Sequence, residues 1–260
     1  MRLLLDLWRN RIVLWELALY DFKHEYLGTW FGILWAFANP ILTAVILWFV
    51  FSHGLRGGGD SQGYFLWLTA GLFPWQFLAN SLRGGTLAIV NHSFLVRKLA
   101  FRVEFLPFVK IISASLLHLP FALALVLIAL FQATSSFLLI QMIYYWFAGA
   151  VLCLAITRGT AAITVFVKDF AGAVEVILQL AFLGTPIFWR PQLLPQSVQD
   201  LLFLNPLYYI VSGYRSTVVE GQAFWQNPIE TFFFWGLTLG FLLAGGFVFR
   251  KLRPIFADHI

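Results

Sequence analysis

The sequence predicts an all-α integral membrane protein with six transmembrane helices, an N-terminal amphipathic helix at the membrane interface, and short re-entrant helices between the fifth and sixth spans. Three observations support this. Apolar residues make up 60% and charged residues 11% of the 260 residues, against about 45–50% and about 25% in soluble domains. Long stretches carry no formal charge. The Lys and Arg residues gather on one side of the predicted spans.

The spans follow from the charge-free stretches, because a transmembrane helix needs about 20 consecutive apolar residues. The uncharged stretch over 111–157 is long enough for two crossings, and Gln132–Ser136 is the only polar tract in it that can form a turn. One transmembrane domain over 26–254 is therefore expected. Its six spans lie at about 31–53, 63–86, 107–131, 137–160, 170–189 and 231–250.

The distribution of Lys and Arg predicts the orientation. With six spans, 14 of the 17 basic residues lie on the side of the two termini, and only Arg56, Arg190 and Arg215 lie on the other side. Basic residues concentrate in cytoplasmic loops, so both termini are expected in the cytoplasm. The net charge of +5 therefore reflects topology, and no nucleic-acid partner is implied.

Residues 1–25 show helical spacing without the uncharged length of a span. Two stripes run along this helix: a polar one of Arg2, Arg9, Glu16 and Lys23, and an aromatic one of Trp8, Trp15 and Phe22. Such a pattern is typical of a helix lying in the membrane interface. The helix either only anchors the first span or also contacts a cytoplasmic partner.

The cytoplasmic loop 91–104 mixes apolar and basic residues. Phe94 and Phe101 alternate with Arg97, Lys98 and Arg102, which a merely solvated loop would not require. The segment is either a docking element for a soluble partner or a connector that lies on the membrane surface.

The outward segment between spans five and six is expected to form two short helices over 192–219. Asn205 and Pro206 are a favourable N-cap and first helical residue, but the helix that they begin is too short to cross. We expect both helices to dip into the outer leaflet. Irregular backbone at that depth is tolerated where it is buried in protein or lines a water-filled cavity, so the pattern indicates a conduit.

Covalent chemistry is not expected, because no cluster of catalytic or metal-ligating residues assembles and no nucleotide-binding glycine loop is present. Energy for uphill transport would have to come from another chain. His118 and Cys153 are interpreted as packing residues. Glu175 in span five either snorkels or pairs with Lys168 or Arg158, or it couples helix motion to a partner.

The aromatic residues leave two interpretations open. Such residues cluster at the start of span one and the end of span five: Trp30, Phe31, Trp35, Phe182, Phe188 and Trp189. They form an interfacial belt and packing contacts, or they line a path along which sugar rings slide.

Several ordered stretches resemble the transmembrane subunit of ABC-2 type exporters, in particular the polysaccharide-exporting branch. They cover nearly the whole chain: Tyr26–Trp35 with Asn39-Pro40, Gly71–Trp75, Phe166–Asp169, Asn205–Tyr208 with Arg215, and the tail Phe249–Ile260. The family's F-x-R-D element has Lys168 in place of arginine. The charge is kept, but the bidentate fork is lost.

The resemblance implies how the protein works. Two copies would join two copies of a separate ATP-binding subunit, which would bind ATP and Mg²⁺, so no cofactor is expected in this chain. The conduit would run between the two permease chains in the bacterial inner membrane, in contact with membrane lipids. The cargo would be a polyprenyl-diphosphate-linked glycan such as O-antigen. The alternatives are capsule or teichoic acid, or a small molecule or drug.

The resemblance also assigns roles to residues. The helix 1–25 and the loop 91–104 would engage the ATPase through Phe94, Arg97, Lys98, Phe101 and Arg102. Four residues would belong to a periplasmic gate: Asn205, Tyr208, Tyr209 and Arg215. Lys168, Asp169 and Glu175 would form a cytoplasmic ion-pair group.

Overall fold

The computed structural model describes residues 9–26, 32–54, 61–96, 102–131 and 136–256, which form helices and no strand. The longest helices are α4 (Ser61–Asn91), α6 (Leu106–Phe131), α8 (Gln141–Phe166) and α12 (Pro228–Leu252), with α3 (Gly32–Phe49) and α9 (Phe170–Gly184) beside them. The shorter helices are α2 (Arg11–Tyr26), α5 (Ser93–Val96), α7 (Ser136–Leu139), α10 (Gln196–Leu202) and α11 (Pro206–Arg215). Short π and 3₁₀ segments extend several of them: η1 (Val50–Gly54), η2 (Val103–Phe105), η4 (Ser216–Glu220) and η6 (Arg253–Ile255).

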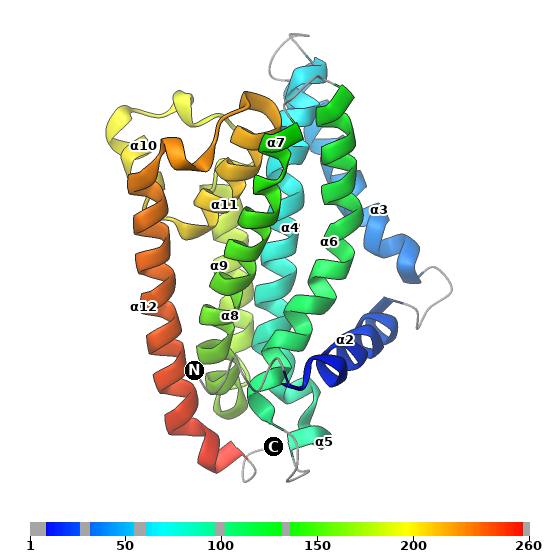
Figure 1. Ribbon diagram of the computed structural model, residues 1–260, viewed down its shortest axis with the longest axis vertical. Coiled ribbons are helices and arrows are strands. Elements are labelled where there is room, and N and C mark those ends of the chain that lie inside the picture. Colours follow the sequence, from blue (N-terminus) through cyan, green and yellow to red (C-terminus); the bar gives the residue numbers. More distant parts are fainter. Residues whose placement is uncertain (1–8, 27–31, 55–60, 97–101, 132–135, 257–260) are drawn as a thin grey trace.

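Helix α4 is the centre of the bundle. It contacts α6, α8, α11, α3 and α9, and nearly all of its side chains between Tyr64 and Trp75 are buried. Figure 1 shows α5 and the last turns of α12 at one end of the bundle, and α7 and α10 at the other. Helix α2 lies beside the α5 end, at an angle to the long helices.

Four helical segments have the length and apolar character of membrane spans: Gly32–His53, Val103–Phe131, Gln141–Phe166 and Pro228–Ile255. They correspond to predicted spans one, three, four and six. Helix α4 has 31 residues, but polar side chains in its second half lower its hydropathy. Helix α9 is an apolar helix of only 15 residues.

The predicted fifth span continued to residue 189, whereas α9 ends at Gly184. Thr185 follows in extended conformation, and its N–H donates to the Ala181 carbonyl. Pro186 explains the end of the helix, because proline has no N–H and disfavours the helical conformation of the residue before it.

The N-terminal helix is present as α2, and its buried face differs from the predicted aromatic stripe. Leu14 and Ala18 are buried against Phe105 of η2 and Val109 of α6. Trp15 is 48% exposed. The expected residues Arg2 and Trp8 lie outside the described part of the chain.

The segment between α9 and α12 contains two short helices, α10 and α11. Asn205 caps α11, since its side-chain oxygen accepts from the Leu207 N–H at 3.0 Å. Helix α11 continues as η4 to Glu220 and ends at Gly221, whose φ of 63° favours glycine. Helical structure thus covers Pro206–Glu220, whereas its re-entry into the membrane stays a prediction.

Candidate functional site: a polar cleft beside α4

A cleft of about 750 Å³ opens between α3, α4 and α9, near the C-terminal end of α2. The floor of the cleft is one face of α4, where Gln76, Asn80 and Arg83 follow one another at helical spacing. These three residues are partly or fully exposed, while Phe77, Leu78 and the other residues between them are buried. The central helix of the bundle is therefore open to its surroundings along a polar stripe.

An ion pair joins the floor to the α9 wall. Arg83 donates through Nε to Glu175 Oε2 at 2.6 Å and through Nη2 to Oε1 at 2.8 Å. Its Nη1 lies 3.4 Å from the Asn80 side-chain oxygen. This is a bidentate arrangement of high geometric specificity. The two side chains are 46% and 36% exposed, so they face the cleft and are not enclosed by protein.

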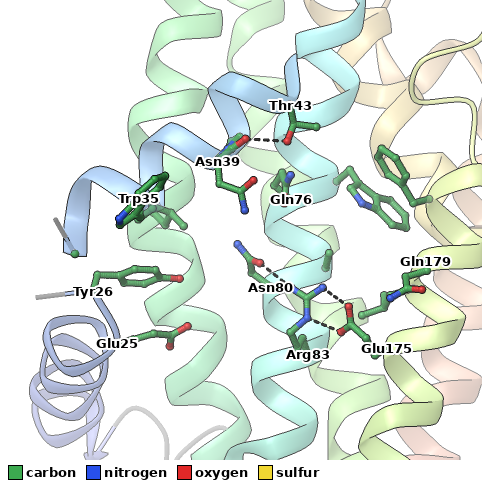
Figure 2. A pocket seen from close by; sticks show the side chains of 18 of the residues that line it. Glu25, Tyr26, Trp35, Asn39, Thr43, Gln76, Asn80, Arg83, Glu175 and Gln179 are labelled. Carbon is green, nitrogen blue, oxygen red and sulfur yellow. Dashed lines mark hydrogen bonds and ion pairs between the residues drawn. The ribbon is translucent and has the colours of Figure 1, made fainter. Parts of the chain in front are cut away.

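The α3 wall supplies further polar groups and an aromatic ring. Asn39 and Thr43 line the cleft, and the Thr43 hydroxyl donates to the Asn39 carbonyl at 2.8 Å. Trp35 lines the same space and is 62% exposed. Figure 2 shows the Asn39, Gln76 and Asn80 side chains directed into the space between α3 and α4. The cleft thus combines carboxamides, an ion pair and an exposed indole.

A second cavity of about 520 Å³ continues toward the α5 end. Both cavities are lined by Glu25, Tyr26, Asn80 and Arg83. The two together form one polar groove that runs from the middle of the bundle to the end where α5 lies.

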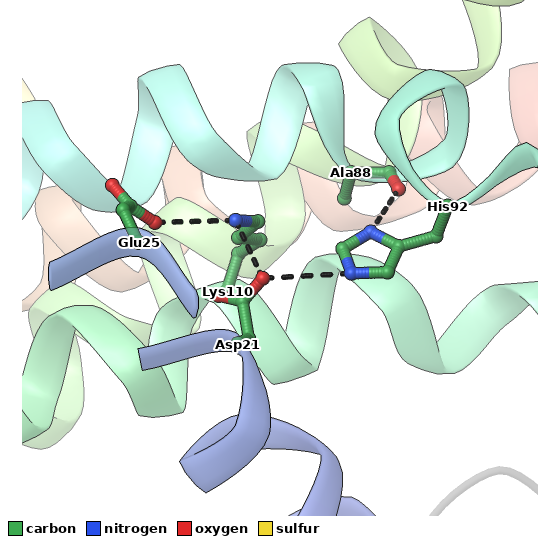
Figure 3. Close-up of polar contacts among 5 residues, drawn as sticks. All are labelled: Asp21, Glu25, Ala88, His92 and Lys110. Carbon is green, nitrogen blue, oxygen red and sulfur yellow. Dashed lines mark hydrogen bonds and ion pairs between the residues drawn. The ribbon is translucent and has the colours of Figure 1, made fainter. Parts of the chain in front are cut away.

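The lower cavity contains a cluster of charges that fixes α2 (Figure 3). The Lys110 ammonium lies 2.7 Å from Asp21 and 3.2 Å from Glu25. His92 Nδ1 donates to the Ala88 carbonyl at 2.9 Å, and its Nε2 lies 3.5 Å from Asp21. Burial raises the pKa of the Asp21 carboxyl, but the hydrogen bonds of His92 and Lys110 outweigh that effect and lower the pKa below its ordinary value.

At the end of the bundle where α7 and α10 lie, Arg215 connects three parts of the chain. Its guanidinium donates to the carbonyls of Trp67, Pro186 and Ile187, and it lies 3.6 Å from the centroid of the Trp67 ring. A Cβ on Gly71 would overlap the guanidinium, so glycine is required there. Arg215 therefore joins α11, α4 and the irregular segment that follows α9.

Comparison with known proteins decides the family. The family model described as ABC-2 type transporter matches residues 13–219. The chain belongs to the ABC-2 type transporter family. Its relatives include O-antigen export system permease proteins RfbA. One from Klebsiella pneumoniae is 25% identical over 241 residues, covering 92% of this chain and 91% of the relative. Another, from Myxococcus xanthus, is 26% identical over 274 aligned positions, covering 100% and 99%.

The chain is accordingly a membrane transport subunit, and ABC-2 permeases normally work with a separate ATP-binding subunit. In the described residues, no group of three or more His, Cys, Asp or Glu side chains could hold a metal ion. His118 and Cys153 are buried, and His118 Nε2 lies 2.9 Å from the Tyr214 hydroxyl. Packing roles for both are consistent with this placement.

The residues predicted to couple this ABC-2 permease to its ATPase are only partly described. Phe94 is 55% exposed on α5, and Arg102 is exposed just before η2. Arg97, Lys98 and Phe101 lie outside the described residues. Their role stays a prediction.

The predicted conduit aromatics separate into different environments. Trp35 and Phe182 line the cleft. Phe188 packs against Phe182 and Phe51, with ring centroids 5.5 Å and 5.2 Å apart, and its carbonyl accepts from the Tyr64 hydroxyl. The Trp189 indole donates to the Leu183 carbonyl at 3.0 Å. Trp30 and Phe31 lie outside the described residues.

The predicted gate residues lie together near the end of the bundle where α7 and α10 lie, mainly in packed positions. The Tyr209 hydroxyl bonds with Thr231 at 3.0 Å and with Tyr144 at 2.9 Å. Asn205 donates to Thr185 at 2.9 Å. Tyr208 borders a small cavity of about 180 Å³ that Tyr209 and Arg215 also line.

The expected partner of Glu175 was wrong. Glu175 pairs with Arg83 and not with Lys168 or Arg158. Lys168 and Asp169 are exposed between α8 and α9, and neither forms an ion pair with another residue of the described ranges. Arg83 and Glu175 are 92 positions apart in the sequence.

Sequence reasoning also missed the polar face of α4. Its signal was available, because Gln76, Asn80 and Arg83 recur at helical spacing within and at the end of an otherwise apolar stretch. The contact of Lys110 with Asp21 carried no comparable local signal.

Proposed function

We propose that this chain is the permease subunit of an ATP-driven exporter that moves a lipid-linked, O-antigen-like polysaccharide across the inner membrane. The names and the near-complete coverage of the RfbA relatives carry the proposal. The polar cleft supports it, because a hydrophilic cargo needs hydrogen-bonding groups within an apolar bundle.

In this proposal α4 and α9 cross the membrane together with the four apolar helices, which gives six spans. Both termini lie in the cytoplasm, at the α5 end. The helices α10 and α11 with η4 re-enter the outer leaflet and close the conduit there.

Two copies of the chain would enclose the path. Large apolar side chains on α3 and α9 flank the cleft and are exposed, among them Leu34, Ile46, Phe49, Ile177 and Leu180. A second copy packed on these helices would cover that apolar surface and turn two open clefts into one enclosed passage.

The ATP-binding subunit would act at the α5 end through residues 1–25 and 91–104. Helix α2 is suited to transmit its movement, because Asp21 and Glu25 connect it to Lys110 on α6 beside the lower cavity. A shift of α2 would therefore change the entrance of the groove.

The experiment is reconstitution of the permease with its ATP-binding subunit in proteoliposomes that contain lipid-linked polysaccharide. We expect the polysaccharide to stimulate ATP hydrolysis and to move to the opposite leaflet, where an added glycosidase can cleave it. Replacing Arg97 and Lys98 with glutamate should abolish movement while the permease stays folded. Replacing Arg250 and Lys251 with glutamate, an equal double charge reversal at the exposed end of α12, is the control.

Two results would overturn the proposal. One is transport by the permease alone without the ATP-binding subunit. The other is ATP hydrolysis that lipid-linked O-antigen leaves unchanged, while a lipid-linked capsule or teichoic acid polymer or a small molecule stimulates it.

A further inference from the structure

The cleft contains hydrogen-bonding groups that the protein itself does not use. Within the described part of the chain, no residue pairs with the side-chain amides of Asn39 and Gln76, and both line the cleft. Asn80 and Gln179 add two more carboxamides, which contact Arg83 and Glu175 with only part of their hydrogen-bonding groups. A carboxamide offers an acceptor oxygen and a donor N–H₂ side by side, which matches adjacent hydroxyl groups of a sugar ring.

The α3 wall adds an apolar platform. The Trp35 ring is 62% exposed beside these amides. An indole has a large flat face for apolar contact and a polar edge, so it can cover the C–H face of a sugar while the amides bind its hydroxyls. The volume of about 750 Å³ lies within the usual range of about 300–1,000 Å³ for small-molecule sites.

The charges decide which sugars fit. Glu25, Arg83 and Glu175 are the acidic and basic residues that line the cleft, which gives a net charge of −1 when all three are ionised. Lys110 of the adjoining cavity contacts Glu25 but is shared with Asp21, so one negative charge remains in excess among these five residues. Glu175 already occupies two donors of Arg83 in a bidentate pair. A carboxylate or phosphate on a sugar of the repeat unit would meet net negative charge and a cation that is already paired, whereas an uncharged sugar would meet no electrostatic repulsion.

We infer that the cleft is a binding site for uncharged sugar rings and selects against repeat units that carry carboxylates or phosphates. The inference rests on the proposed function and names the class of glycan that the groove accepts. The hydroxyl groups of the sugar bind to Asn39, Gln76 and Asn80, and Trp35 stacks on the ring. Glu175 determines specificity because its carboxylate compensates the positive charge of Arg83.

The test uses the complex of permease and ATP-binding subunit in phosphatidylcholine nanodiscs without nucleotide. Two tetrasaccharides of equal length are compared by calorimetry at fixed salt: uncharged mannotetraose and acidic tetragalacturonate. We expect mannotetraose to bind at least about tenfold more tightly. This comparison requires no variant. Equal binding of the two sugars, tighter binding of the acidic one, or no measurable binding of either overturns the inference.

Two variants test the residues. The double substitution Gln76→Leu with Asn80→Leu should weaken binding of mannotetraose by about tenfold or more, since two hydrogen bonds are lost. Gln196→Leu, an equivalent change on exposed α10, should leave it unchanged. Glu175→Gln should strengthen tetragalacturonate binding severalfold and change mannotetraose binding less than about threefold. Unchanged mannotetraose binding in the double variant contradicts the assignment.

Failure of this inference is distinguishable from failure of the proposed function. A complex that exports lipid-linked polysaccharide but binds both tetrasaccharides equally refutes only the inference. A complex that binds mannotetraose selectively but never moves lipid-linked polysaccharide refutes the proposed function.

Discussion

Replacing Arg215 with methionine should strongly destabilise the outer end of the bundle. Arg215 is 4% exposed, and three carbonyls depend on its guanidinium, those of Trp67, Pro186 and Ile187. Methionine would leave these carbonyls without their charged donor, at about 1–3 kcal/mol for each buried acceptor left unsatisfied, while the cost of burying the guanidinium would disappear, so we expect a net loss of about 3–5 kcal/mol. At about 2–4 °C per kcal/mol for a chain of this size, the melting temperature should fall by roughly 10 °C.

The melting temperature can be measured through Cys153, the only cysteine of the sequence, because this residue is 0% exposed in the folded protein. A thiol-reactive fluorogenic dye added to the purified permease in detergent will react only when the bundle opens. Arg190→Met is the matched control: Arg190 is exposed and lies 5.9 Å from the same Trp67 ring, so its loss should shift the transition by less than about 2 °C. If Arg215→Met melts within 2 °C of the unmodified protein, the guanidinium does not connect α11 to α4 as argued.

Three further predictions concern other contacts. A Cβ on Gly245 would lie 2.5 Å from a backbone oxygen of α8, so Gly245→Ala should destabilise the folded permease by about 1–3 kcal/mol. Gly240 has open space around it, so Gly240→Ala should not destabilise the protein. Equal melting temperatures of the two variants would refute this prediction. Because the pKa of Asp21 is lowered in the folded protein, its carboxylate stabilises the fold above about pH 4, and this stabilisation is lost as pH falls through the folded-state pKa. Asp21→Asn should therefore lower stability at pH 7 and flatten the acid limb of a pH–stability profile. An unchanged acid limb would contradict the argument. The pair of Arg83 and Glu175 is partly exposed, so a double-mutant cycle with alanine should give a coupling free energy of about 0–1 kcal/mol in melting experiments. A coupling free energy well above this range would show that the pair stabilises the fold.

The sequence predicted the apolar helices well because one physical requirement governs them. A bilayer demands long uncharged helices, and the apolar parts of α3, α6, α8 and α12 satisfy it without help from other parts of the chain. Helix α9 was predicted five residues too long because hydropathy ignores backbone geometry. Pro186 was the available signal for its end at Gly184.

The side-chain contacts of the site could not be predicted in the same way. Glu175 was recognised as unusual, but its partner Arg83 is 92 positions away, and only the packing of α9 beside α4 brings them together. Asp21 on α2 was treated as part of a surface helix, yet it is buried against Lys110. Charges inside an apolar chain are easy to notice, whereas their pairing depends on the tertiary structure.

The two attachments of the α9 segment to α4 differ in strength, and the difference has a mechanical consequence. Within α9, Glu175 contacts Arg83 through a pair that is open to the cleft and therefore contributes little to stability. Beyond its end, Pro186 and Ile187 are fixed to α11 and α4 by the buried Arg215. A displacement of α9 away from α4 thus costs least free energy at the Glu175 end. We therefore expect any widening of the cleft to begin on the side where α2 and α5 lie, while the end near Arg215 stays in place.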